Sequence, residues 1–270
     1  MIGLGSYAFF WQHSELAPRR LDAFDMLRRT AELNVELFQF CDYAPIEDLT
    51  RDELARLSDL AHELGITLEL GTKGVTPDHL EKYLDLANAL DASIVRSMLY
   101  SPTSRPTLTE AESQLRQVLG AYDDSGVDLA LETYEQVSST DLVGLVEQVA
   151  HSRLGICLDP ANSVAALENP GDVIARTAPY VKNIHVKDFA FTRRGGWVGF
   201  TLEGAPLGTG LLDYDYLLET VRPNDRGINQ VIEHWLPLHD TIDETVLLEN
   251  DWTFHNLTSL TSSTSKRSTN

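Results

Sequence analysis

Cysteine is scarce in this chain, with two among 270 residues. Cys41 and Cys157 lie in strand-like surroundings, and neither belongs to a spacing that is typical of thiolate metal sites. This favours buried free thiols over the disulfide framework that small secreted domains use in place of a large core, with a single structural bridge as the alternative. We expect two buried free thiols.

Basic residues are few as well. The chain has 21 Lys and Arg against 41 Asp and Glu, which gives a formal net charge of −20. Such a field repels nucleic acid and anionic lipid, so neither is an expected partner. Small substrates that are neutral, or anionic and held by local cations, remain compatible with this charge.

Long apolar runs are missing. The longest are far shorter than the roughly 20 residues that a membrane span needs. The first residues, MIGLGSYAFF, lack the basic region of a signal peptide and begin like a strand. We expect no membrane partner and a cytoplasmic location.

What the chain does have is regular alternation of strand-like and helix-like stretches, with a period of about thirty residues per pair. The expected strands are 2–10, 35–40, 66–71, 93–100, 127–134, 154–159, 181–189 and 228–235. The expected helices are 19–33, 47–64, 77–90, 108–123, 139–150, 170–178, 213–221 and 240–258. Eight such pairs close a parallel barrel, so we predict the α/β class and a (β/α)8 TIM barrel.

The domain organisation follows from this pattern. Residues 1–259 are expected to form a single catalytic domain, and residues 260–270, which are polar and of low complexity, a disordered C-terminal tail. The glycine-rich stretch from Arg193 to Gly210 is too long for an ordinary connection and is expected to form a lid or wall over the site.

Four polar residues, Glu132, Asp159, His185 and Glu233, end consecutive strand-like runs in the second half of the chain. Active sites of barrel enzymes lie at these strand ends, and buried carboxylates need a charged partner. A single such residue could equally cap a nearby helix, but four in succession favour a metal site. Three carboxylates and one imidazole suit Mn²⁺, with Mg²⁺, Co²⁺ and Zn²⁺ as alternatives.

This site is also expected to carry acid/base chemistry. A metal chelated by a hydroxycarbonyl compound would stabilise an enediolate, and Glu132 and Glu233 on either side could move protons. Strand parity places His185 and Lys187 on one face, so Lys187 is expected to act at the same site, with an ion pair as the alternative.

The chain resembles the xylose isomerase-like TIM barrel superfamily, in its sugar phosphate isomerase/epimerase branch. The resemblance covers roughly residues 2–258 and is carried by the Glu/Asp/His/Glu order, by the segment HVKD at 185–188 and by PLGTGLLDY at 206–214. It implies that the four residues are metal ligands, that the two glutamates form the acid/base pair of isomerising members, and that the protein self-associates.

Two positions depart from that pattern. Asn162 stands where epimerases of the group carry a histidine that positions substrate, and Tyr134 stands where many relatives have histidine after the first glutamate. Both are expected to contact substrate. A phenol donates a hydrogen bond but is a poor base near neutrality.

Arg96 interrupts the otherwise apolar strand SIVRSML, and arginine suits the capture of a carboxylate or phosphate. The alternative is a salt bridge inside the barrel, for instance with Glu69. Tyr7 and Trp235, each near a strand's C-terminal end, are expected to provide an apolar wall for substrate.

These observations lead to a divalent-metal-dependent isomerase or epimerase of a small polyhydroxy carbonyl compound, with a carbohydrate as its partner. The alternative is a lyase on the same scaffold, either a decarboxylase of a 3-oxo sugar acid resembling 3-oxo-isoapionate or an inosose-type dehydratase; Asn162 and Lys187 favour it. A nuclease of the AP endonuclease type shares the barrel, but the net charge of −20 argues against it.

Overall fold

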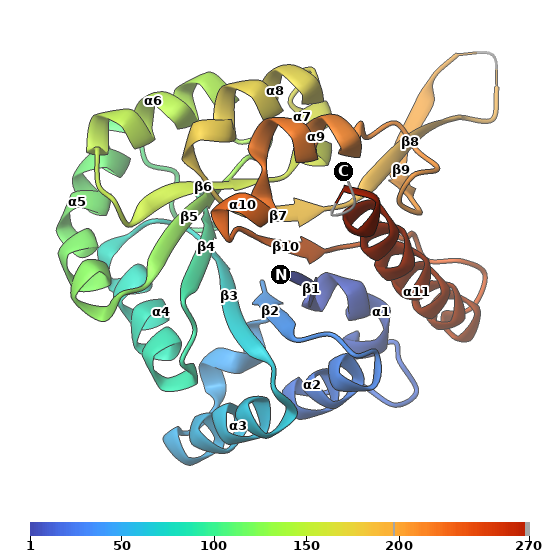
Figure 1. Ribbon diagram of the computed structural model, residues 1–270, viewed down its shortest axis with the longest axis horizontal. Helices are drawn as coiled ribbons and strands as arrows, with labels where there is room; N and C mark the ends of the chain where they lie inside the picture. The colour runs from blue at the N-terminus through green and yellow to red at the C-terminus, as the bar shows by residue number, and fades with distance from the viewer. Residues whose placement is uncertain (197, 268–270) are drawn as a thin grey trace.

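The computed structural model describes residues 1–196 and 198–267, and of 261–267 only the backbone. Eight parallel strands form a closed barrel in the order β1-β10-β7-β6-β5-β4-β3-β2, which Figure 1 shows nearly end-on. The barrel strands are β1 Ile2–Gly5, β2 Leu37–Cys41, β3 Thr67–Lys73, β4 Ile94–Met98, β5 Asp128–Glu132, β6 Leu154–Leu158, β7 Val181–Val186 and β10 Asn229–Ile232. The (β/α)8 prediction is confirmed.

Helices surround this barrel. They are α1 Phe10–His13, α2 Ala23–Glu32, α3 Arg51–Leu64, α4 Pro77–Leu90, α5 Leu108–Ser125, α6 Ser139–Val149, α7 Pro160–Ala165, α8 Pro170–Thr177, α9 Tyr214–Val221, α10 Pro223–Arg226 and α11 Ile242–Arg267. Three short 3-10 turns complete them, η1 Ser6–Phe9, η2 Ala44–Asp48 and η3 Ala178–Tyr180. Local signals set the ends: Thr50 and Glu53 form a capping box on α3, and Gly65 ends that helix at a φ of 69°.

Two stretches differ from the sequence expectations. The first strand is shorter than 2–10, because η1 and α1 begin at Ser6 and Phe10. Residues 193–210 are not one long loop: β8, Asp188–Arg193, pairs antiparallel with β9, Phe200–Ala205, and this hairpin projects beside α11 (Figure 1). Cross-strand backbone hydrogen bonds satisfy polar groups that an irregular loop would leave to water.

The C-terminal helix also differs from expectation. α11 runs to Arg267, so the backbone is helical where a disordered tail was expected from residue 260, and the side chain of Leu260 is fully buried. Residues 268–270 lie outside the described part of the chain. The division into a domain over 1–259 and a tail stays a prediction.

The apolar core lies between the strands and the helices, whereas the barrel interior is largely polar. Near the N-terminal ends of the strands, four buried residues form what we call the amide cluster: Gln39, Glu69, Asn183 and Asn229. Glu69 Oε2 accepts hydrogen bonds from Gln39 Nε2 (3.0 Å) and Asn183 Nδ2 (2.9 Å), and Oε1 accepts one from Asn229 Nδ2 (2.7 Å). Burial nevertheless raises the pKa of Glu69.

Candidate metal centre and active site

A second buried group, the charged cluster, lies above the amide cluster at the C-terminal ends of β4, β5, β6, β7 and β10. It consists of Arg96, Glu132, Asp159, His185, Lys187 and Glu233, each at most 5% exposed. Parallel strands present these ends on one side of the barrel, which is why residues separated by up to 137 positions (233 − 96) can meet. The structure therefore brings together all four residues that the sequence predicts as metal ligands.

His185 lies at the centre of the three carboxylates. Its Nδ1 is 3.1 Å from Glu132 Oε1, 3.4 Å from Glu233 Oε1 and 3.9 Å from Asp159 Oδ2. The other ring nitrogen, Nε2, lies 2.8 Å from Gln39 Oε1. Because Gln39 gives its amide hydrogens to Glu69, its oxygen must accept, so Nε2 carries a hydrogen. Burial alone would lower the pKa of His185, but Cys157, Glu233 and Glu132 raise it well above its ordinary value, so Nδ1 also holds a proton, which a bound cation would displace.

Lys187 supplies positive charge beside this centre. Its Nζ is 2.7 Å from Asp159 Oδ2 and 3.0 Å from Glu233 Oε2, and it lies 4.7 Å from the ring centroid of Trp235. Burial alone would lower the pKa of Lys187, but the two carboxylates outweigh it and raise that pKa well above its ordinary value. Lys187 is thus a buried ammonium at the site that the sequence predicts for it.

Arg96 makes a different contact from the one considered in the sequence. It pairs with Glu132 and, at 2.8 Å, with Asp42, not with Glu69. The predicted salt bridge between Arg96 and Glu69 is not formed. The Glu69 carboxylate instead accepts hydrogen bonds from the side-chain amides of Asn183, Asn229 and Gln39. Burial would raise the pKa of Glu132, but Arg96 and His185 hold it well below its usual range, whereas burial raises the pKa of Asp159 to about 6.

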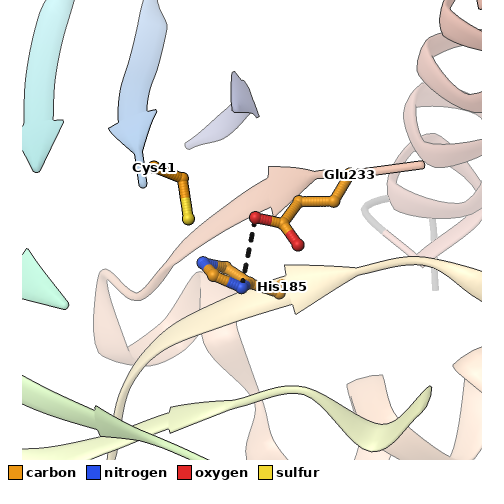
Figure 2. Close-up of side chains that lie close together, drawn as sticks. All are labelled: Cys41, His185 and Glu233. Carbon is orange, nitrogen blue, oxygen red and sulfur yellow. Dashed lines mark ion pairs between the residues drawn. The ribbon is translucent and has the colours of Figure 1, made fainter. Parts of the chain in front are cut away.

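The donor set fits a divalent cation. Within the described residues, Glu132, Asp159 and His185 offer ligand atoms within 4.8 Å of one another, and Cys41, His185 and Glu233 do so as well (Figure 2). Glu233 Oε1 is buried and has no hydrogen-bond donor among the described residues. Oxygen and imidazole donors of this kind hold Mg²⁺, Mn²⁺ or similar ions, but they do not select one metal.

The predicted substrate contacts lie around this centre. Asn162, in the first turn of α7, donates from Nδ2 to Glu132 Oε1 (2.9 Å), while its Oδ1 is buried without a partner in the described chain. Tyr7 donates to Asp42 Oδ2 (3.2 Å). Tyr134 is half-buried, and burial and nearby Glu135 raise its pKa. Their roles in binding substrate stay predictions.

Sequence reasoning missed three residues of the site, all on or just after β2: Gln39, Cys41 and Asp42. Gln39 and Cys41 share one face of the strand LFQFC, and a glutamine within such an apolar run is the signal that could have found them. Asp42 left no comparable signal, because its contact with Arg96 depends on a left-handed backbone (φ 52°) at the strand end.

The chain matches a known protein family and is similar to a known enzyme. The profile of the family described as "Xylose isomerase-like TIM barrel" matches residues 3–250. A 3-oxo-isoapionate decarboxylase of Pectobacterium atrosepticum is 52% identical over 256 residues, which cover 95% of this chain and 93% of the relative.

Solved structures agree on the fold. An L-ribulose 3-epimerase superposes with a TM-score of 0.70 at 16% identity, over 99% of this chain and 96% of that one. A xylose isomerase-like TIM barrel protein from Mycobacterium smegmatis in complex with magnesium gives a TM-score of 0.67 at 16% identity, over 94% and 96%. At such identities the likeness concerns architecture alone.

The expectation of an isomerase or epimerase is therefore wrong as the main assignment. The epimerases among its structural neighbours are distant, at 16% identity for the L-ribulose 3-epimerase, whereas a relative that shares half of the residues is named as a decarboxylase. The departures at Asn162 and Tyr134 likewise weaken the likeness to epimerases. As for membranes, no described helix combines the length and apolar character that a span requires.

Proposed function

The chain belongs to the xylose isomerase-like TIM barrel family, and on that premise we propose that it is a metal-dependent decarboxylase of a 3-oxo sugar acid such as 3-oxo-isoapionate. The observation that carries the proposal is a pair of buried cations, Lys187 and Arg96, in one cluster with the three carboxylates and the imidazole. An anionic substrate in an acidic protein needs such local positive charge. The likeness to the Pectobacterium decarboxylase supports the choice of substrate class.

Four residues would hold the cation: Glu132, Asp159, His185 and Glu233. When bound, a divalent ion supplies Lewis-acid stabilisation for negative charge that develops on a substrate oxygen. Mn²⁺ is the metal we propose, with Mg²⁺, Co²⁺ and Zn²⁺ as alternatives from the same donor set.

The chemistry asks three things of the protein. The bond between the carboxylate carbon and its neighbour breaks, its electron pair moves toward the 3-oxo group, and CO₂ departs. The carbon that has lost CO₂ must then take up a proton. The enzyme therefore has to bind the carboxylate, keep it turned out of the plane of the ketone, and protonate that carbon.

Lys187 and Arg96 divide these tasks. Arg96 is held by ion pairs with Asp42 and Glu132, so its guanidinium places a fixed positive charge beside the substrate carboxylate. Lys187 is fully protonated beside Asp159 and Glu233, and its Nζ can donate the proton that the product carbon needs and regain one from solvent. Trp235 beneath the ammonium keeps water from that face.

The remaining predicted residues position the substrate. Asn162 orients Glu132 through its amide and leaves its own Oδ1 free for a substrate hydroxyl. Tyr134 offers a phenol whose raised pKa keeps it a neutral donor, and the Tyr7 phenol, whose hydrogen goes to Asp42, can accept a hydrogen bond from a substrate hydroxyl. We further propose a cytoplasmic location and a homo-oligomeric state.

The test is release of labelled CO₂ from 3-oxo-isoapionate carrying a labelled carboxylate, with Mn²⁺ present. Lys187→Met should lower the rate about 10³-fold, because both the positive charge and the proton donor are lost. Lys182→Met is the matched control: this lysine lies on β7, which ends one residue before Lys187, and it pairs with Asp128 at 2.9 Å, away from the site.

Three outcomes would reject the proposal. One is turnover of ketoses with every carbon retained and no CO₂ from any 3-oxo acid, and another is loss of water in place of CO₂. The third is an equal loss of rate in Lys187→Met and Lys182→Met, which would show that the reaction has no specific need for Lys187.

A further inference from the structure

Cys41 places a thiol at the edge of the carboxylate and imidazole centre. It is the last residue of β2, is 2% exposed, and its Sγ lies within 4.8 Å of ligand atoms of His185 and Glu233. Figure 2 shows the three side chains converging from β2, β7 and the end of β10. The mechanism proposed above makes no use of this thiol.

The position of the thiol is well supported. Ser6 Oγ donates to the carbonyl of Cys41 (2.5 Å) and accepts from its N–H (2.9 Å), so both backbone groups are held. On the neighbouring strand, Gly71 leaves the space that the side chain occupies: a Cβ there would lie 2.9 Å from Cys41 Cα and 3.1 Å from Sγ.

A second observation points to a ligand at this place. Glu233 Oε1 is buried, faces His185 Nδ1 at 3.4 Å and receives no hydrogen bond from the described residues. Sulfur, nitrogen and oxygen donors together are a set that soft and borderline ions prefer, whereas Mn²⁺ and Mg²⁺ prefer oxygen.

We propose that Cys41, His185 and Glu233 form a second, thiolate-containing cation site that takes soft divalent ions such as Cd²⁺. Binding forms a sulfur–metal bond and releases the thiol proton to solvent. Because His185 and Glu233 belong to both ligand sets, a soft ion bound here excludes the catalytic arrangement. The chain therefore carries a built-in route to inhibition by soft metals.

The experiment is a titration of the metal-free full-length protein with Cd²⁺, followed by the ultraviolet charge-transfer absorption from thiolate to Cd²⁺. The absorption should appear in the wild type and in Cys157→Ser, the matched control, since Cys157 is also a buried barrel thiol but joins neither ligand group. It should be absent in Cys41→Ser, with Cd²⁺ affinity lower by about tenfold or more. Mn²⁺ binding by the same variant checks that the barrel is intact.

The proposal is overturned if the absorption persists in Cys41→Ser, or if Cys157→Ser abolishes it. If Cys41→Ser folds poorly, Cys41→Ala replaces it: absence of the absorption supports the proposal and its persistence overturns it. The absorption does not depend on turnover, so failure of the decarboxylase proposal and failure of this one are separate results: the first shows in CO₂ release and the second in the spectrum.

Discussion

The barrel interior contains two buried clusters with carboxylates. They differ in whether neutral amides or cations compensate the negative charge. In the amide cluster, Glu69 receives three hydrogen bonds from neutral amides, and both of its oxygens have donors. In the charged cluster, three carboxylates face two fixed cations and an imidazole, and Glu233 Oε1 has no donor in the described chain. A buried carboxylate whose oxygens both accept hydrogen bonds within the protein stabilises the barrel. A buried carboxylate oxygen without a donor is free to bind a ligand.

The largest expected effect is on catalysis. Glu233→Gln should lower CO₂ release about 10³-fold, because a charged ligand is lost while the side chain keeps its shape. Glu69→Gln should retain activity but lower the free energy of unfolding by about 1–3 kcal/mol, since an NH₂ group would then face amide donors. Activity assays and urea unfolding of both variants measure the two effects. Reversed behaviour would mean that the two clusters have been assigned the wrong roles.

A pH effect extends the comparison to Glu249 of α11. This buried carboxylate accepts from the backbone N–H of Trp11 (2.8 Å) and of Gln12 (3.1 Å), and burial raises its pKa from 4.5 to about 7. The folded state therefore holds a proton that the unfolded state has lost, so stability falls as pH rises from about 4.5 to 7. The expected loss is at most about 3 kcal/mol.

Urea unfolding of the wild type and of Glu249→Gln across that pH window measures this contribution. The glutamine variant should show the smaller decrease, with Mn²⁺ affinity unchanged because Glu249 lies outside the charged cluster. Parallel pH curves for the two proteins would show that Glu249 titrates alike in both states.

Removal of the metal should lower the free energy of unfolding by the amount that metal binding contributes. Mn²⁺ at a hundred times its dissociation constant should stabilise the wild type by about 2.7 kcal/mol, and a chelator should remove this gain. Glu69→Gln should show the same gain from its lower baseline. Thermal unfolding with and without Mn²⁺ makes the comparison, and a gain that Glu233→Gln retains in full would contradict it.

The smallest expected effect concerns Asn162, whose amide orients Glu132 at 2.9 Å. Asn162→Ala should weaken Mn²⁺ binding or activity about tenfold, as loss of an outer partner of a metal ligand commonly does. Titration calorimetry and steady-state kinetics give the two quantities. If neither changes, Glu132 is held by Arg96 and His185 alone.

The sequence predicted the architecture well because strand and helix periods are local properties. It also predicted which residues meet, since Glu132, Asp159, His185 and Glu233 each end a parallel strand and such ends lie on one side of a barrel. The contact of Arg96 with Asp42 could not be predicted, because Asp42 lies just after β2, 54 residues earlier in the chain. The hairpin of β8 and β9 was missed because its glycines and arginines read as a loop.

Of the two buried clusters, the charged cluster is the proposed metal site and the amide cluster is not. The most direct measurement is Mn²⁺ binding, from the electron paramagnetic resonance signal of the free ion, in the wild type, Glu69→Gln and Glu233→Gln. We expect Glu69→Gln to bind like the wild type and Glu233→Gln to bind at least about tenfold more weakly. Equal binding by the two variants, or loss with Glu69→Gln alone, would contradict the claim.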